Sequence, residues 1–238
     1  MKPKIILLPF FVLLLFLTTR GYSQTKKTVE GPRWRVGLNI QYASSFKNVQ
    51  INYPALNYTG ILGGFTGKGL GIFGGYKLHK YLALEVETGI LLNSYNRNYG
   101  QGIYIIGRFN KFYVQPGVKF IYPIIKNDNK TINICLGGGL GFVASGRLYL
   151  EDQYTGTRAI TYARYDPMVA PFLTIGGELL LTNRSNITIG FKYQDGVFNA
   201  TQYYDSTDPS QNIKTAPKNI KNLNAQGLGL MVGIIQEF

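Results

Sequence analysis

Apolar side chains alternate with small or polar ones along eight segments of the chain. In the first segment the apolar residues Val36 and Leu38 stand on either side of Gly37, and the same spacing continues in both directions. Because successive side chains of a strand point to opposite faces, each segment predicts a β-strand with one apolar face. The predicted strands are Arg33–Ser44, Gly67–Leu78, Tyr81–Tyr95, Phe109–Tyr122, Thr131–Ser145, Val169–Leu181, Asn186–Asp195 and Leu228–Phe238.

The connections between these strands alternate in length. The short ones are His79–Lys80, Pro123–Lys130 and Thr182–Ser185. The long ones, which we predict to be loops, are Phe46–Thr66, Asn96–Arg108, Gly146–Met168 and Phe198–Asn222. Pro116 and Pro171 lie inside predicted strands and lack a ladder donor, so we expect a bulge or a rim position at each.

An even number of antiparallel strands, joined by alternating short turns and long loops, is typical of barrels that span the bacterial outer membrane. We therefore predict an all-β fold, an eight-stranded antiparallel up-and-down transmembrane β-barrel. A soluble barrel of the lipocalin type is the alternative, since it also closes with eight strands. Its interior would have to be apolar, whereas the second face here carries Gly, Asn, Gln, Glu and Lys, so we favour the membrane barrel.

The amino end resembles an export signal. Lys2 and Lys4 precede the apolar run Ile5–Leu17, and the small residues Gly21 and Ser23 suit cleavage by signal peptidase. The run is shorter than the roughly 20 residues of a spanning helix, which argues against a retained anchor. The predicted organisation is a signal peptide at 1–23, a short periplasmic leader at 24–32 and an outer-membrane barrel domain at 33–238.

Composition agrees with this class of protein. The chain is 45% hydrophobic, only 16% charged and contains 29 glycines, which suits a membrane protein built from strands. Its formal charge is +13, but the bases are scattered over turns and loops of an exported chain, so we predict no nucleic-acid partner. Anionic outer-membrane lipid, including lipopolysaccharide, is the expected counter-charge.

The long connections are rich in tyrosine and arginine. The tyrosines are Tyr53, Tyr58, Tyr99, Tyr104, Tyr154, Tyr162, Tyr203 and Tyr204. They fit the aromatic girdles of membrane barrels and fit adaptable recognition by loops equally well. The nearby bases that we expect to meet lipopolysaccharide phosphates are Arg97, Arg108, Arg147, Arg158 and Arg164.

Three stretches and the last residue carry a resemblance to a known family. The stretches are Lys80–Gly89, Phe112–Phe120 and Leu136–Phe142, and the last residue is Phe238. With them the chain resembles the porin-like outer-membrane β-barrel family, including its PorT-like group associated with type IX secretion. The resemblance implies a bacterial outer-membrane location and recognition of Phe238 by the barrel-insertion machinery, and it supplies no catalytic residue.

Charged residues on the polar faces form the sharpest candidate site. They are Arg35, Lys77, Glu85, Glu87, Lys119, Glu178 and Lys192. An unpaired charge inside a barrel is costly, and eight strands leave an interior about wide enough for side chains alone. We therefore predict a structural network of ion pairs that fills the lumen; a proton or ion path is the alternative.

The sequence gives little support for a catalytic site, a metal site or a phosphate-binding loop. His79, the only histidine, falls in a predicted periplasmic turn, so a Ser–His pair at the external rim cannot be built. Cys135, the only cysteine, excludes an intramolecular disulfide, and we predict no metal, cofactor or catalytic residue. The Gly137–Gly141 run lacks the Lys and Ser/Thr of a phosphate-binding loop.

We therefore predict a non-enzymatic outer-membrane barrel with a structural, adhesion or accessory role. It would act through its external loops on lipid or on an envelope protein, and the resemblance to the PorT-like group implies a secretion-associated form of the accessory role. A small-solute channel is the first alternative, and a lipid-modifying enzyme is the second.

Overall fold

The computed structural model describes residues 34–47, 49–53, 58–100, 103–127, 130–154, 157–181, 184–207, 209–210 and 212–238. They belong to one compact unit, Pro32–Phe238. The predicted signal peptide, the predicted leader and the first residue of the first predicted strand lie outside the described residues. No helix among the described residues is long and apolar enough to cross a membrane.

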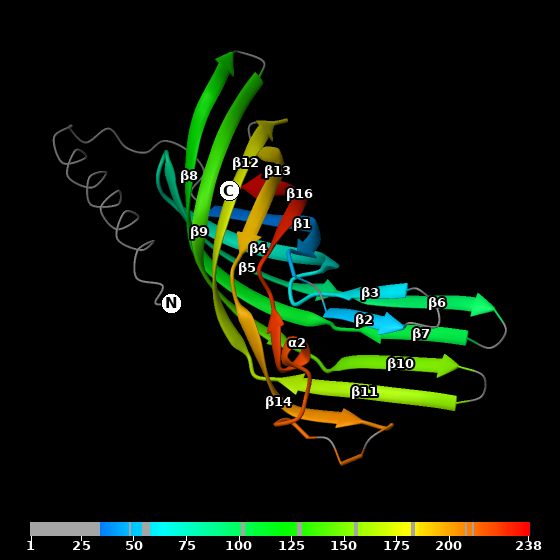
Figure 1. Cartoon of the computed structure of the whole chain (residues 1–238). Helices are drawn as coiled ribbons and strands as arrows, with labels where there is room; N and C mark the ends of the chain where they lie inside the picture. Colours follow the sequence, from blue (N-terminus) through cyan, green and yellow to red (C-terminus); the bar gives the residue numbers. More distant parts are fainter. Residues whose placement is uncertain are drawn as a thin grey trace. The chain divides into compact units, whose positions relative to one another are not determined.

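Eight antiparallel strands close into a barrel in the order β1-β16-β13-β12-β9-β8-β5-β4, and β4 pairs back with β1 (Figure 1). Their bounds are β1 Trp34–Ser45, β4 Gly67–His79, β5 Leu82–Leu92, β8 Lys111–Asn127, β9 Lys130–Ser145, β12 Met168–Leu180, β13 Ser185–Gln194 and β16 Gly227–Glu237. These are the eight predicted strands, so the predicted fold is confirmed.

The two faces of the barrel wall are those that the alternation predicts. In β1 every second side chain is buried in the interior, and the side chains between them are exposed on the outside. The outward Ile40 is 65% exposed, whereas Arg35 is completely buried. An apolar outside around a polar inside fits hydrocarbon, where a closed barrel satisfies every backbone group. It is the reverse of the lipocalin arrangement.

The predicted long loops contain further strands, so their assignment as loops is wrong. The strands are β2 Val49–Tyr53, β3 Tyr58–Leu62, β6 Ser94–Gly100, β7 Ile103–Arg108, β10 Leu148–Tyr154, β11 Thr157–Tyr165, β14 Val197–Asp205 and β15 Asn222–Asn224. Strands β2 and β3 form a hairpin, and the other six form a sheet in the order β15-β14-β11-β10-β7-β6 (Figure 1). We call this six-stranded sheet the outer sheet.

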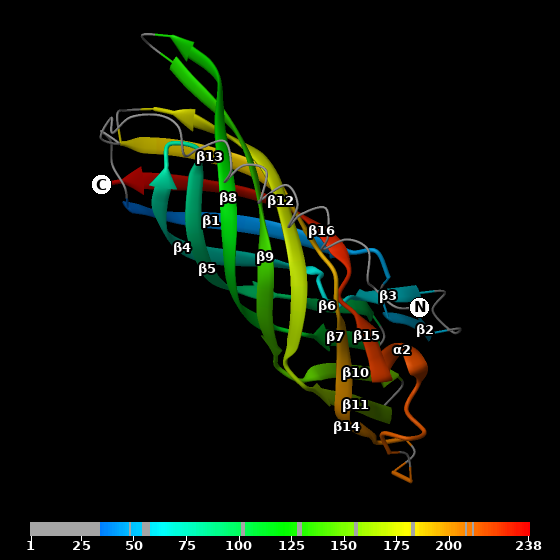
Figure 2. The ribbon, with the colours of Figure 1, turned by 90° about the vertical axis from the view of Figure 1, so that its left-hand side faces the viewer.

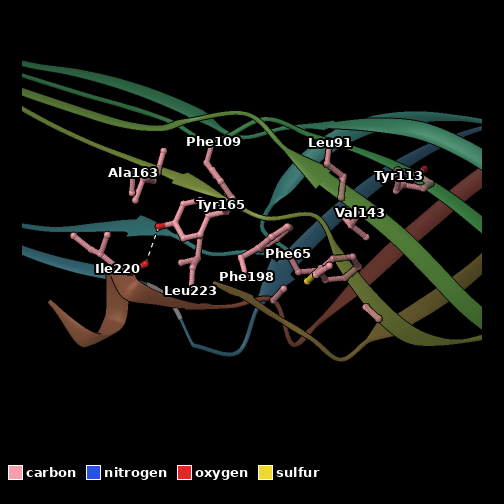
Figure 3. Close-up of a cluster of buried hydrophobic side chains, with 14 of the residues drawn as sticks. Phe65, Leu91, Phe109, Tyr113, Val143, Ala163, Tyr165, Phe198, Ile220 and Leu223 are labelled. Atoms are coloured by element: carbon pink, nitrogen blue, oxygen red, sulfur yellow. Dashed lines mark hydrogen bonds between the residues drawn. The ribbon is translucent and has the colours of Figure 1, made fainter. Parts of the chain in front are cut away.

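A large apolar cluster joins the outer sheet to one end of the barrel interior. Phe109, Tyr165 and Phe198 pack edge to face, with ring centroids 5.4–6.0 Å apart (Figure 3). The short helix α2 (Lys218–Lys221) contributes Ile220, whose carbonyl accepts a hydrogen bond of 2.9 Å from the Tyr165 hydroxyl. Members from the barrel wall are Ala43, Leu91, Tyr113, Val143, Met168 and Ala170. The segment that carries α2 is thus folded onto the inner face of the sheet.

Of the two prolines inside predicted strands, Pro116 does not form the expected bulge, whereas Pro171 lies at an edge position. The pairing of β8 with β5 runs without a shift through Pro116, and β8 keeps the same register with β9 before and after it, so no bulge forms there. Pro171 lies at the edge of the β12–β13 pairing, where its carbonyl accepts from the amide of Asp195, which fits the expected rim position. The register of β8 with β9 shifts instead between Pro123 and Ile125.

This register shift lies in the β8–β9 hairpin, which is longer than the sequence pattern predicts. Residues 123–127 and Lys130, which belong to a predicted short connection, continue β8 and β9, and the pairing of these strands extends to Asn127 and Lys130. Both strands run past their neighbours at the end of the barrel opposite the outer sheet (Figure 2).

Candidate functional site

The interior of the barrel holds two clusters of polar side chains that come from strands far apart in the sequence. The first, which we call the basal charge cluster, lies toward the short turns. It consists of Arg35, Lys77, Glu85, Lys119, Glu178 and Glu237. The period-two pattern turns all six side chains inward, and closure of the barrel brings them together.

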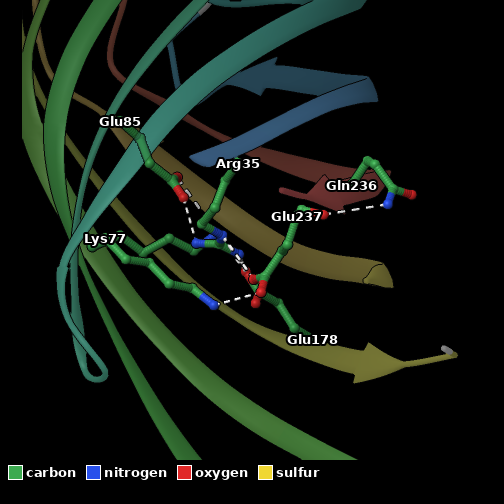
Figure 4. A network of polar contacts seen from close by, with 7 residues as sticks. Arg35, Lys77, Glu85, Glu178, Gln236 and Glu237 are labelled. Carbon is green, nitrogen blue, oxygen red and sulfur yellow. Dashed lines mark hydrogen bonds and ion pairs between the residues drawn. The ribbon is translucent and has the colours of Figure 1, made fainter. Parts of the chain in front are cut away.

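Arg35 is the centre of the basal charge cluster (Figure 4). Its Nη1 lies 2.6 Å from Oε1 of Glu85, and its Nη2 lies 2.6 Å from Oε1 of Glu178. Its Nε faces Oε1 of Glu237 at 3.2 Å. Three carboxylates from β5, β12 and β16 thus surround one guanidinium, whose planar fork of donors suits several acceptors at once.

Two lysines complete the charge balance. Nζ of Lys77 lies 2.5 Å from Oε2 of Glu237, and Nζ of Lys119 lies 2.7 Å from Oε1 of Glu178. Nζ of Lys119 also faces Glu85 at 3.5 Å. Three bases therefore meet three carboxylates. Burial of ions is costly unless they are paired and hydrogen bonded, and this balance is what allows Arg35 to lie fully inside the barrel.

The second cluster, the central polar cluster, lies farther along the strands. Nζ of the fully buried Lys192 is 2.7 Å from Oε2 of Glu87 and 2.8 Å from Oε1 of Gln115. Oε1 of Glu87 accepts two more bonds, from the Tyr113 hydroxyl at 2.8 Å and from Nδ2 of Asn39 at 3.0 Å. A single ion pair is thus enclosed by neutral hydrogen-bonding groups.

A glycine makes room for this cluster. A Cβ on Gly71 would come 2.6 Å from Oδ1 of Asn39, 2.7 Å from Oε1 of Glu87 and 2.8 Å from the Tyr113 hydroxyl. Such distances are far shorter than ordinary contacts, so any larger residue at position 71 displaces part of the cluster. The glycine is needed here for close approach, since the side chains of three other strands meet above its backbone.

The layers stack along the barrel. On β5 alone, Glu85 belongs to the basal charge cluster, Glu87 to the central polar cluster and Leu91 to the apolar cluster. A cavity of about 80 Å³ lies beside the two polar layers and is lined in part by Asn39, Glu85, Glu87 and Lys119. This volume has room for a few water molecules. Side chains of both clusters bridge the interior from strand to strand beside this cavity.

The structure brings together all seven charged residues that the sequence singled out, but in two groups. Arg35, Lys77, Glu85, Lys119 and Glu178 belong to one, and Glu87 with Lys192 belong to the other. Glu237 was missed, although its place on the polar face of the last strand was the available signal. The neutral members Asn39, Tyr113 and Gln115 carried no signal of their own, because only closure of the barrel shows what they face.

One buried base stands apart from both clusters. Nζ of Lys111 donates to the carbonyl of Thr66 at 2.5 Å and lies 5.0 Å from the centroid of the Phe109 ring. No carboxylate of the described ranges pairs with it.

The residues considered for other chemistry are dispersed. His79 lies at the turn between β4 and β5, with its ring 5.6 Å from that of Tyr81, at the end of the barrel away from the outer sheet. Cys135 is buried, and among the described residues no group of three or more His, Cys, Asp or Glu side chains is arranged to hold a metal.

Comparison with solved structures supports the fold, at sequence identities of 9–13%. The chain is similar to the outer membrane protein OprG from Pseudomonas aeruginosa, with 9% identity over 87% of this chain and 96% of that chain and a TM-score of 0.57. Neisserial surface protein A follows at 13% identity, 86% and 97% coverage and a TM-score of 0.47. Ail of Yersinia pestis has 10% identity, 87% and 99% coverage and a TM-score of 0.42.

The likeness to OprG supports an eight-stranded outer-membrane β-barrel, in agreement with the apolar exterior. No protein-family model matches the chain, and no curated protein sequence matches it significantly. The resemblance to the PorT-like group therefore stays a prediction.

Proposed function

We propose that the chain is a non-enzymatic protein of the bacterial outer membrane that acts through its outer sheet, as a structural, adhesion or accessory component of the envelope. The observation that carries this proposal is the filled interior. Ion pairs cross the lumen in the basal charge cluster, the Lys192–Glu87 pair crosses it again, and the apolar cluster occupies the remaining end. A barrel occupied in this way is a membrane anchor for the sheet that it carries.

The orientation follows from the connections. Barrels of this kind place short turns in the periplasm and long connections outside the cell. The outer sheet continues the strands at the ends that carry the long connections, so it stands on the cell surface in this proposal. A secretion-associated accessory role, as in the PorT-like group, is a narrower form of the same proposal.

The small-solute channel is the second candidate, because the cavity of about 80 Å³ lies beside both polar clusters. Recording from purified protein in planar bilayers separates the two. We expect no discrete conductance steps from the wild type under conditions in which a general porin conducts. A wild type that conducts, with an ion selectivity that changes in Glu87→Gln, would establish the channel and contradict our proposal.

Orientation is tested separately with a thiol reagent that does not cross membranes. In a Cys135→Ser background, a cysteine replacing Tyr204 in the outer sheet should be labelled on intact cells. One replacing His79 should react only after the outer membrane is permeabilised. The opposite result would place the outer sheet in the periplasm.

A further inference from the structure

The outer sheet has two different faces. Its inner face is the one covered by the α2 segment, with Leu148, Ala163 and Phe198 buried in the apolar cluster. Pairing between neighbouring strands aligns the residues of the other face in rows. Arg108 pairs with Tyr149, Tyr149 pairs with Tyr162, and Tyr162 pairs with Tyr204. One arginine and three tyrosines from four strands therefore form a single row on the uncovered face.

Basic residues border this row on the side of the barrel. Arg147 precedes β10, and Arg164 on β11 lies two residues from Tyr162; both are exposed. Cζ of Arg147 lies 5.6 Å from the centroid of the Tyr162 ring, which itself stacks on Tyr204 at 5.1 Å. We call Arg108, Arg147, Tyr149, Tyr162, Arg164 and Tyr204 the tyrosine–arginine face.

The tyrosine–arginine face has an excess of positive charge. Beyond the row, Glu151 is held between Nε of Arg158 at 2.6 Å and the Tyr149 hydroxyl. That carboxylate therefore balances Arg158 and also attracts Arg108 electrostatically. No ion pair is formed by Arg108, Arg147 or Arg164 in the part of the chain that the structure describes. Three guanidinium groups beside three phenol rings attract a ligand that is anionic and has flat or hydroxylated surfaces.

The position of the face identifies that ligand. On β9 and β12, the paired residues Phe142 and Val169 belong to the apolar outside of the barrel and are 55% and 57% exposed. The chain reaches Arg147 five residues after Phe142, and Arg164 five residues before Val169. A lipid whose acyl chains cover Phe142 and Val169 therefore has its head group against the arginines, and a head group with several sugars is long enough to run along the whole tyrosine row.

We propose that the tyrosine–arginine face binds the phosphorylated sugar head group of lipopolysaccharide in the surrounding leaflet. Arg147 and Arg164 contact its phosphates, and Tyr149, Tyr162 and Tyr204 contact its sugars. An ordinary anionic phospholipid has a phosphate for the arginines but no sugars to extend along the row as far as Tyr204. The inference rests on the proposed orientation, which exposes the outer sheet to the leaflet that contains lipopolysaccharide.

The test uses the purified full-length barrel in detergent, immobilised and titrated with lipopolysaccharide or with phosphatidylglycerol micelles. Loss of two surface arginines in Arg147→Gln/Arg164→Gln should weaken lipopolysaccharide binding by about 30-fold. The matched control, Lys80→Gln/Lys126→Gln, removes the same charge from exposed positions at the other end of the barrel and should leave binding unchanged. Tyr204→Ala should weaken lipopolysaccharide binding but not phosphatidylglycerol binding, because no arginine contacts its ring among the described residues. Glu151→Gln should strengthen lipopolysaccharide binding by freeing Arg158.

Equal weakening in both double variants would reduce the effect to general charge attraction and overturn the proposal. The proposal would also be overturned if phosphatidylglycerol binding depended on Tyr204 as strongly as lipopolysaccharide binding does. Each variant is first checked for heat-modifiable migration on gels, which shows that its barrel is folded. Conductance separates the two proposals: a silent barrel that ignores lipopolysaccharide refutes only this inference, and a conducting barrel that binds it refutes only the proposed function.

Discussion

Arg35 and Glu178 lie 143 positions apart in the sequence, yet their side chains meet inside the barrel with 2.6 Å between Nη2 and Oε1. Both side chains are almost completely buried. Glu178 also pairs with Lys119, so one carboxylate serves two bases from β1 and β8. The contact depends on every strand pairing between them, which makes it a sensitive indicator of barrel closure.

Removal of this carboxylate should destabilise the barrel. Glu178→Gln keeps the size of the side chain but leaves Arg35 and Lys119 short of one negative charge, and breaking one half of a buried pair costs about 3–5 kcal/mol. The free energy of unfolding in urea, followed by heat-modifiable migration, measures the loss. Glu151→Gln on the outer sheet is the control and should cost much less, because its partner Arg158 is exposed to solvent, which screens the pair. If Glu178→Gln and Glu151→Gln lowered the free energy of unfolding equally, burial of the Arg35–Glu178 pair would not add to its contribution to stability.

The central polar cluster should behave as a coupled pair. Glu87→Gln and Lys192→Met each leave an unpaired buried charge, while the double variant removes both charges together. We expect the double variant to lose less stability than the sum of the single losses, with a coupling of about 1–3 kcal/mol. Strictly additive losses would mean that the two side chains do not interact, contrary to the 2.7 Å contact between Nζ and Oε2.

Two glycines of β4 offer a matched comparison. A Cβ on Gly71 meets three polar atoms within 2.8 Å, whereas a Cβ on Gly74 has nothing within 4 Å. Gly71→Ala should therefore cost about 1–3 kcal/mol by crowding the central polar cluster, and Gly74→Ala should be close to neutral. Comparable effects in unfolding titrations would assign the cost to the strand backbone rather than to the crowded interior.

The apolar exterior predicts a depth-dependent cost for charge. Leu84 points outward from β5 and is 46% exposed. Leu84→Arg should destabilise the barrel in phospholipid vesicles by about 2–4 kcal/mol if the residue lies near the midplane of the bilayer. Tyr104→Arg, at an exposed position of the outer sheet, should be nearly neutral. If both substitutions were tolerated equally, the outside of the barrel would not be in contact with lipid.

The outer sheet should show a carboxylate that titrates at low pH. A hydrogen bond from Arg158, and to a lesser extent one from Tyr149, holds the pKa of Glu151 below its ordinary value of 4.5. The stabilisation from these bonds is therefore complete above pH 4.5 and is lost as the pH falls through the lowered pKa. In carboxyl NMR titrations, Arg158→Gln should raise the midpoint of Glu151. Burial, rather than a bond to Arg158, raises the pKa of Asp152, so the Asp152 midpoint should not move. A shift of both midpoints would indicate a general change of the sheet.

The strands of the barrel could be predicted because their signal is local. A period of two, read over residues such as Val36 and Leu38, requires no knowledge of the partner strand, and it also separates inside from outside. The same alternation gave the inward direction of the charged residues and hence the prediction of a network. Glu237 was within reach of this reasoning, since it shares the polar face of the last strand.

The outer sheet was not recognised because its signal is short and mixed. Leu148 and Leu150 alternate with Tyr149 and Glu151, but the run ends after two repeats, and aromatic residues occupy the polar positions. One face of this sheet is buried because the α2 segment packs against it. The hydrogen bond from the Tyr165 hydroxyl to the carbonyl of Ile220, 55 residues later in the sequence, shows this packing. A pattern within one segment contains no information about such a distant cover.

Alternation depends only on neighbouring residues, so the class of fold, the eight strands of the wall and the apolar face of each strand could be predicted from the sequence. The division of the charges into two clusters, the need for glycine at position 71 and the rows of the tyrosine–arginine face became visible only in the folded barrel. Each of these depends on strand register, and register is set by contacts between segments that are remote in the chain.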